Sequence, residues 1–464
     1  IVGQELDDSG PSRLQLLFCY GPITSHCLVR IVGPSDELTM WDPGGIYGFH
    51  SPMDARVDDV VYVAGLETLP DQKPLHNCRW LLFQHRHDVW NLVYRDESGR
   101  TREPSPVGLL RNRELLVTCN PTLTQPGEYS GLAEPTVYRF DTTGIRGECT
   151  KELPVWKDQP RFTEHSYRTV VADSEYNEVL YIQNVGMDVA HKSYLDSDGK
   201  WSGEGHIRWP YADEYQEPQP LRLCYPNVIM RDRAVHFLGV SDVVEPMQEW
   251  KRSKYEVTGR EWDYVFRRLF YAYTPNVKDQ QFGQWIEIAN FDATAGHIQN
   301  NDIWLSPDGT IHLIWCEINT DVRLKKKFFP DKNLVYSLKY LTMRNEKIQT
   351  SQTLARICEQ EDGRRPQFAR FHILSDGTLV VLASFVPNTP TSDQVTVCCL
   401  AEIPTGSTTL KWIDVPLSGS FSGAFFTNTV RGGSMPSDII DVVGISPNKA
   451  NTVGYARIRV DSSG

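Results

Sequence analysis

Five stretches of the chain carry His, Tyr, Arg or Asn where a purely structural β-strand would carry Val, Ile or Ala. These residues are His50, His165, Arg168, Tyr225, His297, Asn301 and Arg370. Each stands a short distance before a recurring polar turn. A single one is weak evidence, because a polar residue beside a channel can simply be solvated or can hydrogen-bond a neighbouring backbone. Together they predict a functional pocket, provided that the fold brings them to one place.

The combination of His, Tyr and Arg, without an evident carboxylate pair, favours β-elimination at a uronic acid. An Arg side chain would neutralise the sugar carboxylate by paired hydrogen bonds, which makes the adjacent C5 proton more acidic. A neutral His would take that proton, and a Tyr or a second His would protonate the departing glycosidic oxygen. A hydrolase would instead need two suitably spaced Asp or Glu residues. A sialidase would need a Tyr nucleophile and three Arg residues, and only Arg168 and Arg370 are inner-strand candidates.

The elements that must position these residues are predicted by an internal repeat, in which a polar or acidic turn precedes four or five apolar residues. The repeat occurs at 57–63, 112–117, 176–182, 231–238, 307–314, 375–381 and 437–443. Seven copies in 464 residues give roughly 66 residues per unit, which suits a four-stranded propeller blade with loop insertions. Helical periodicity is almost absent, and short β-branched and aromatic runs alternate with Gly, Pro, Asn and Asp.

We therefore predict an all-β fold, a seven-bladed β-propeller of four-stranded antiparallel blades that spans residues 1–464 as a single domain. The turn would join the first and second strands of each blade, and the apolar run would be the buried second strand. A C-terminal strand near 453–460 would pair with an N-terminal strand near 14–18 and close the ring, which removes exposed edges.

In such a fold the innermost strand of every blade lines a central channel, so the seven polar residues would converge there. His165 and Arg168 are three positions apart and would face opposite sides of a regular strand, so a shared pocket requires a bend or a curled Arg side chain. Arg168 also opens an apolar run, where a guanidinium needs an anionic partner. A ligand carboxylate is one such partner, and a salt bridge between blades is the structural alternative.

Other polar residues are expected to be structural. His236 and His312 occupy the same place in two repeats, which indicates packing between blades. His85 and His87 share one face of a strand, but two ligands without a third predict a metal site poorly. The charged stretch 249–263 is interpreted as an inserted, solvated loop, with a partner site as the alternative. Most of the ten Cys are expected to be free and buried.

Composition excludes several classes of protein. Lys and Arg number 47 against 59 Asp and Glu, a net charge of −12, so a general nucleic-acid partner is not expected. No apolar run approaches the ~18 residues of a membrane span. The chain begins with Ile rather than Met, as it would after removal of a signal peptide. The sequence does not determine the cellular compartment, and a secreted or periplasmic location is favoured.

The chain resembles the BNR-type seven-bladed propellers that include ulvan lyases, rhamnosyl-glucuronate lyases and related α-L-rhamnosidases. The likeness is carried by 50–52 (His-Ser-Pro), 165–168 (His-Ser-Tyr-Arg), 225–242 and 296–315. It implies a His acid or base, a Tyr or His partner and an Arg that neutralises a carboxylate. These roles pass to His165, Tyr225 and Arg168, with His50 as a second His. No cofactor is required, and some relatives hold a structural metal ion in the channel.

The sequence thus predicts a polysaccharide lyase that cleaves a bond to a uronic acid, on a rhamnose-containing polysaccharide or its oligosaccharides. In this hypothesis the catalytic residues are His165, Tyr225 and His50, and the substrate-binding residues are Arg168, Arg370, His297 and Asn301. A glycoside hydrolase such as an α-L-rhamnosidase is the alternative enzyme. A non-catalytic propeller that binds glycans or proteins is the alternative from another class.

Overall fold

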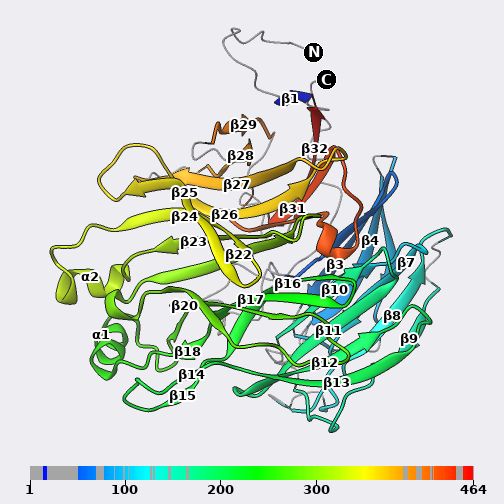
Figure 1. Cartoon of the computed structure of the whole chain (residues 1–464), viewed down its shortest axis with the longest axis horizontal. Coiled ribbons are helices and arrows are strands. Elements are labelled where there is room, and N and C mark those ends of the chain that lie inside the picture. Colours follow the sequence, from blue (N-terminus) through cyan, green and yellow to red (C-terminus); the bar gives the residue numbers. More distant parts are fainter. Residues whose placement is uncertain are drawn as a thin grey trace.

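The repeated apolar runs form the second strands of seven four-stranded antiparallel blades, which surround a common centre (Figure 1). This arrangement comes from a computed structural model. It describes residues 14–17, 51–68, 78–87, 89–97, 100–102, 104–125, 128, 131–144, 148–163, 167–389, 395–403, 410–417, 421, 423–445 and 453–462.

The first three blades follow one another along the chain, each running from the inner to the outer strand. Blade 1 contains β2 (Asp54–Val57), β3 (Val60–Thr68), β4 (Cys78–Arg86) and β5 (Val89–Arg95). Blade 2 contains β6 (Val107–Leu109), β7 (Glu114–Cys119), β8 (Thr136–Asp141) and β9 (Thr150–Glu152). Blade 3 contains β10 (Arg168–Asp173), β11 (Glu178–Val185), β12 (Val189–Leu195) and β13 (Trp201–Arg208).

Blades 4 to 6 are built in the same way. Blade 4 contains β16 (Leu223–Arg231), β17 (Ala234–Ser241), β20 (Arg268–Thr274) and β21 (Ile286–Asn290). Blade 5 contains β22 (His297–Leu305), β23 (Ile311–Ile318), β24 (Val335–Arg344) and β25 (Lys347–Cys358). Blade 6 contains β26 (Arg364–Ile373), β27 (Leu379–Pro387), β28 (Val397–Glu402) and β29 (Ile413–Val415).

Blade 7 closes the ring with strands from both ends of the chain. It contains β30 (Phe425–Thr427), β31 (Ile439–Ile445), β32 (Val453–Ser462) and β1 (Leu14–Leu17). Leu14 pairs with Ser462 and Leu17 with Arg459, so β1 is the outer strand beside β32. The predicted seven-bladed fold and its closure by terminal strands are therefore confirmed.

The predicted turns join the first and second strands of every blade, and Asp-Gly-Thr builds two of them. In blade 5 the carboxylate of Asp308 accepts a hydrogen bond from the backbone N–H of Thr310 at 3.0 Å. Gly309 between them has a φ of 85°, a left-handed conformation that glycine adopts without steric cost. Asp376 and Thr378 repeat the bond in blade 6 at 2.8 Å.

Two histidines of the second strands have packing roles, but their hydrogen bonds lie within a blade and not between blades as predicted. The imidazole Nδ1 of His236 lies 2.7 Å from the hydroxyl of Tyr271 on the third strand of the same blade. His312 and Tyr340 repeat this contact in blade 5, again at 2.7 Å. The pKa of His236 falls to about 3, because burial disfavours the charged ring.

The centre of the propeller is filled by charged side chains around Asp302. This carboxylate is 1% exposed and lies 2.9 Å from Nε of Arg431, which belongs to η2 (Val430–Gly432) of blade 7. Its other oxygen accepts a hydrogen bond from the backbone N–H of Phe371 in blade 6 at 3.0 Å. Nη1 of Arg370 is 3.6 Å away. One side chain thus connects blades 5, 6 and 7.

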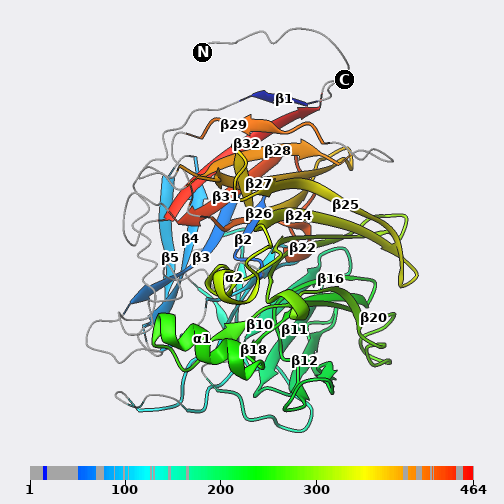
Figure 2. The same ribbon diagram turned by 90° about the vertical axis from the view of Figure 1, so that its left-hand side faces the viewer.

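Insertions in blades 4 and 5 carry the two α-helices. They are α1 (Gln248–Thr258), between β17 and β20, and α2 (Val322–Phe328), between β23 and β24. The hairpin of β18 (Val243–Val244) and β19 (Tyr264–Val265) belongs to the blade 4 insertion. The hairpin of β14 (Tyr211–Ala212) and β15 (Gln219–Pro220) connects blades 3 and 4, and the 3₁₀ turn η1 (Asp292–Thr294) connects blades 4 and 5. Figures 1 and 2 both show α1 beside α2, which it contacts.

The prediction of an inserted, solvated loop over 249–263 is right about the insertion and about exposed side chains such as that of Trp262, but wrong in part, because the stretch forms α1 and its Lys254 is fully buried. Nζ of Lys254 lies 2.7 Å from Glu245, 2.9 Å from Asp263 and 3.5 Å from Asp321. Arg267 donates a second cationic contact to Glu245 at 2.8 Å. A run of charged residues is solvated only when it has no partners of opposite charge nearby, and here the carboxylates of Glu245, Asp263 and Asp321 surround Lys254.

The eight cysteines in the described residues are free, and six of them are buried, in line with the prediction. Neither α1 nor α2 is long and apolar enough to cross a membrane, and the described part of the chain has no other helix that is.

We predict that Asp302→Asn destabilises the protein by about 3 kcal/mol, because it leaves two buried guanidinium groups without their carboxylate. Urea unfolding followed by fluorescence measures the change. The control is Asp331→Asn, on an exposed carboxylate, which should change stability by less than about 0.5 kcal/mol. Equal effects of the two substitutions would contradict the role given to Asp302.

Candidate functional site

The inner strands begin on one face of the ring, and the described candidate residues lie on four of these strands, β10, β16, β22 and β26. Tyr225 is near the start of β16, His297 begins β22 and Arg168 begins β10. Asn301 and Arg370 lie deeper, in the middle of β22 and β26. His50 and His165 lie outside the described residues, so their roles stay predictions.

An aromatic row runs across this face from blade 3 to blade 5. The ring of Tyr167 lies 5.3 Å from that of Tyr225, and Tyr225 lies 5.7 Å from Phe266. Phe266 in turn meets the imidazole of His297 edge-on at 5.5 Å. The structure therefore brings Tyr225 and His297, two of the predicted residues, into one continuous surface.

The backbone at Tyr225 departs from regular β structure. Its φ is 48°, and the pairing of β16 with β17 shifts register between Cys224 and Asn227. The side-chain amide of Asn300 in blade 5 donates a hydrogen bond to the carbonyl of Tyr225 at 2.8 Å, which holds this conformation. Strained backbone of this kind concentrates at functional sites, so the geometry of Tyr225 supports its place in the candidate site.

A buried Arg supports the row from below. Arg222 pairs with Asp242, and its guanidinium lies 5.2 Å from the ring centroid of Tyr167 and 5.6 Å from that of Tyr264. Burial, and then the nearby Tyr225 and other acidic groups, raise the pKa of Tyr167 well above its ordinary value. Tyr167 therefore keeps its proton at neutral pH and can donate a hydrogen bond.

Beside His297 lies a cavity of about 410 Å³, bounded by blades 5, 6 and 7. Its polar lining consists of His297, Gln299, Glu317, Tyr336, Arg365 and Gln367. Gln299 follows His297 by two positions on β22, before the register shift of that strand, so both point to one side. Gln367 lies at the register shift of β26 and lines the cavity together with Arg365. The cavity is a concave site with few, convergent polar groups, as ligand sites commonly are.

Arg365 is the cation of this cavity, and the sequence reasoning missed it. Its guanidinium lies 5.1 Å from the ring centroid of Tyr336, and Nη1 is 3.4 Å from the hydroxyl of that residue. Among the described residues no carboxylate forms an ion pair with Arg365. The signal that could have revealed it is its place at the start of the inner strand β26, five residues before Arg370.

The cavity also holds one carboxylic acid and one neutral base. Burial raises the pKa of Glu317, although a hydrogen bond from Nε1 of Trp315 at 2.8 Å opposes the shift. His297 is open to solvent in the cavity but is surrounded by protein, and this desolvation lowers its pKa to about 4. Arg323, Arg267 and Lys254 act in the same direction, while Asp321 opposes them. His297 is therefore uncharged at neutral pH.

The remaining described candidates are enclosed by protein. Arg370 is 2% exposed and bonds the side chain of Asn227 at 3.2 Å and the carbonyl of Asn301. Asn301 is fully buried and accepts a bond from the backbone N–H of Cys316 at 3.2 Å. Nη2 of Arg168 donates to the carbonyl of Pro104 at 2.7 Å. A ligand would reach these groups only if such contacts opened, so their substrate-binding roles stay predictions.

No group of three or more potential metal ligands occurs in the part of the chain that the structure describes. His85 packs instead between the rings of Trp90, at 4.8 Å, and Tyr455, at 4.7 Å. A structural metal ion in the channel remains an expectation from the resemblance alone.

No protein-family model matches the chain, and no curated protein matches it in sequence. Among solved structures, a PL25 ulvan lyase bound to -[GlcA(1-4)Rha3S]- is 9% identical, covers 90% of this chain and 93% of its own, and has a TM-score of 0.52. A second structure of a PL25 ulvan lyase is also 9% identical, has the same coverage of both chains and has a TM-score of 0.50. A Penicillium chrysogenum α-L-arabinanase is 12% identical over 76% and 92% of the two chains, with a TM-score of 0.44. The likeness to the two ulvan lyase structures shows a shared fold.

We predict that His297 titrates with a pKa near 4. NMR of ¹³C-labelled histidine would follow the ring, with His297→Gln used to assign its signal. In the unfolded chain the same ring has a pKa of about 6.5, so between about pH 6.5 and pH 4 the unfolded state binds more protons than the folded state. The free energy of unfolding therefore decreases as the pH falls through this range. A midpoint near pH 6.5 would contradict this prediction, because it is about the value of a solvated imidazole and would show that the cavity does not desolvate the ring.

Proposed function

We propose that this protein is a polysaccharide lyase that cleaves a glycosidic bond to a uronic acid at the cavity beside His297. The observation that carries the proposal is Arg365, a cation in a concave site that has no carboxylate partner among the described residues. An anionic sugar would supply the missing partner. The fold shared with ulvan lyase, a lyase solved with a glucuronate-containing ligand, adds support.

In this mechanism Arg365 forms paired hydrogen bonds with the sugar carboxylate and neutralises it. A base then removes the C5 proton, the bond from C4 to the glycosidic oxygen breaks, and a double bond forms between C4 and C5. The departing oxygen takes a proton from a nearby acid. Each step keeps charge close to a group that can stabilise it, which lowers the barrier to elimination.

The described residues suit some of these roles better than others. His297 is unprotonated at neutral pH, but a pKa of about 4 makes it a weak base. It is better suited to orient the sugar by a hydrogen bond. We assign the base to His165, with His50 as the second candidate, and the acid to Tyr225, whose ring lies in the same aromatic row. Arg168, Arg370 and Asn301 support the centre from behind the site.

A glycoside hydrolase is the second candidate, and Glu317 is the residue that favours it. A carboxylic acid whose pKa is raised by burial can act as a general acid toward a glycosidic oxygen. Hydrolysis also needs a second carboxylate across the bond. Glu317 is the one carboxylate that lines the cavity in the described residues, so the lyase is the better supported reaction. A non-catalytic propeller would bind the polymer without cleaving it.

The substrate we propose is a polysaccharide that contains uronic acid, with rhamnose-containing polymers such as ulvan first among them. A lyase releases a 4,5-unsaturated uronate that absorbs in the ultraviolet, whereas a hydrolase releases saturated ends. Incubation with ulvan, gum arabic and other uronate polymers should therefore produce this absorbance. New reducing ends without absorbance would favour the hydrolase, and an intact polymer would favour the binder.

Arg365→Lys should slow turnover at least about tenfold, because a lysine keeps the charge but loses the paired hydrogen bonds. The matched control is Arg364→Lys at the neighbouring position. Arg364 pairs on the outside with Asp414 at 2.8 Å, so its substitution should leave turnover within about twofold. Equal losses for both variants would remove Arg365 from the mechanism.

His165→Ala should abolish turnover while the melting temperature is retained. A variant that unfolds, or one that stays fully active on the polymer that the wild type cleaves, would show that His165 has a structural role and no catalytic one. His50→Ala tests the second base candidate in the same assay, and the variant with the larger loss of kcat identifies the base.

A further inference from the structure

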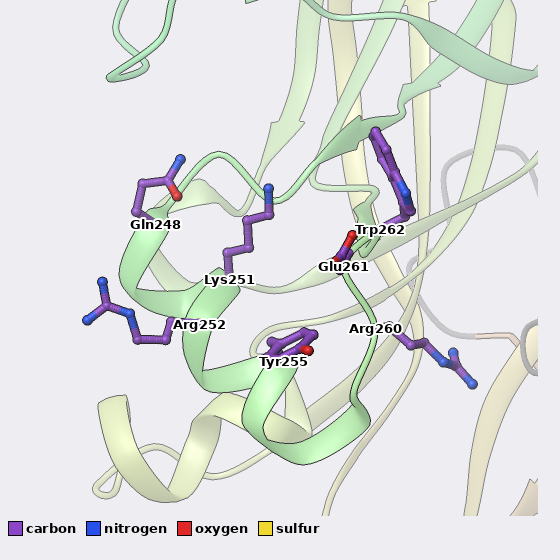
Figure 3. Close-up of a pocket in the computed structure, with 7 residues that line it drawn as sticks. All are labelled: Gln248, Lys251, Arg252, Tyr255, Arg260, Glu261 and Trp262. Atoms are coloured by element: carbon purple, nitrogen blue, oxygen red, sulfur yellow. The ribbon is translucent and has the colours of Figure 1, made fainter.

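A second pocket, of about 390 Å³, lies on the blade 4 insertion and shares no lining residue with the cavity beside His297 (Figure 3). It is lined by Gln248, Lys251, Arg252, Tyr255, Arg260, Glu261 and Trp262. None of these residues has a role in the proposed elimination. Figure 3 shows Lys251 and Trp262 on opposite sides of the pocket, with Tyr255 projecting from the helix below.

Local sequence explains why these side chains meet. Positions 248, 251, 252 and 255 recur every three or four residues and therefore share one face of α1. Gly259 ends the helix with a φ of 67°, and its N–H donates to the carbonyl of Tyr255 at 2.8 Å. This left-handed residue reverses the chain, so that Trp262 returns alongside the helix.

The pocket combines exposed aromatic rings with cations. Trp262 is 69% exposed and Tyr255 is 48% exposed, although rings of this size usually bury most of their surface. The lining contains three cations and one carboxylate, Glu261, in a chain whose net charge is −12. No ion pair of Lys251 or Arg252 occurs among the described residues. A local excess of positive charge on an acidic protein favours an anionic ligand.

This outer face is not needed to hold α1 in place, because the inner face does so. Lys254 is fully buried among the three carboxylates of Glu245, Asp263 and Asp321. Trp250 packs edge-on against Phe329 of the α2 segment at 5.7 Å. The helix is therefore anchored on one side, and its aromatic and cationic side is left for a ligand.

We propose that this pocket is a second sugar-binding subsite, which takes an acidic residue of the same polysaccharide. The indole of Trp262 and the phenol of Tyr255 would cover the apolar face of a sugar ring, and Lys251, which Figure 3 shows extending into the space between the helix and Trp262, would bind its carboxylate or sulfate. The choice of a sugar rests on the proposed function, whereas the preference for an anion rests on the charge of the pocket.

The subsite and the cavity share a structural support. Asp321 contacts Lys254 of α1 and also lies close enough to His297 to oppose the lowering of its pKa. A polymer held at α1 would therefore stay near the cavity, and its next residues would bind as if at high local concentration. The subsite thus favours long acidic polymers over short oligosaccharides.

Affinity electrophoresis through gels that contain polygalacturonate, dextran sulfate or dextran tests the subsite without requiring turnover. We expect retardation by one or both acidic polymers and none by dextran, and the acidic polymer that retards the protein shows whether carboxylate or sulfate is recognised. Trp262→Ala and Lys251→Gln should each weaken that binding about tenfold. Melting temperatures confirm that both variants fold.

Two matched controls lie outside the pocket. Val257→Ala removes another exposed apolar side chain of α1, and Lys347→Gln removes an exposed cation of β25, so both should bind within about twofold of wild type. Unchanged binding by folded Trp262→Ala and Lys251→Gln, or equal retardation by dextran, would overturn the subsite. If the wild type cleaves a uronate polymer but the two pocket variants bind as it does, the lyase is supported and the subsite is refuted. If binding depends on Trp262 but no polymer is cleaved, the subsite is supported and the lyase is refuted.

Discussion

The carboxylate of Asp302 is the contact on which the centre of this propeller depends. Inner strands that meet at a ring axis bury backbone and side-chain groups together, and each cation placed there needs a partner. Asp302 supplies one to Arg431 of blade 7, lies beside Arg370 of blade 6, and also accepts the backbone N–H of Phe371. Three blades are thereby fixed relative to one another, and the face above them becomes a rigid base for a site.

A second buried charge, that of Lys254, holds the insertions of blades 4 and 5 together by ion pairs. Its three carboxylates come from the connection after β17, from the return to β20 and from the loop before α2. The helices are consequently part of the scaffold rather than excursions from it. This anchoring holds Asp321, Arg323 and Lys254 close enough to His297 to shift the pKa of that residue.

The polar groups of the site differ from those of the interior in how much of their surface protein atoms cover. Arg370 and Asn301 are satisfied by protein partners in the interior, whereas Arg365 reaches a cavity in which Tyr336 is its main neighbour. Desolvation keeps His297 uncharged and Glu317 prone to hold a proton. A cation without a carboxylate partner among the described residues is the feature of this site that supports the proposed anionic sugar.

The sequence by itself determined the strand-and-turn repeat, the seven blades and the closure by terminal strands, because local turn chemistry and apolar runs encode them. It also placed Tyr225 and His297 at inner-strand starts. Only the tertiary structure decided which polar groups face the cavity, since β22 and β26 each shift register, between Asn300 and Asp302 and between Pro366 and Phe368. Such a shift reverses the alternation of sides, so spacing along the chain could not show that Asn301 turns inward while Arg365 lines the site.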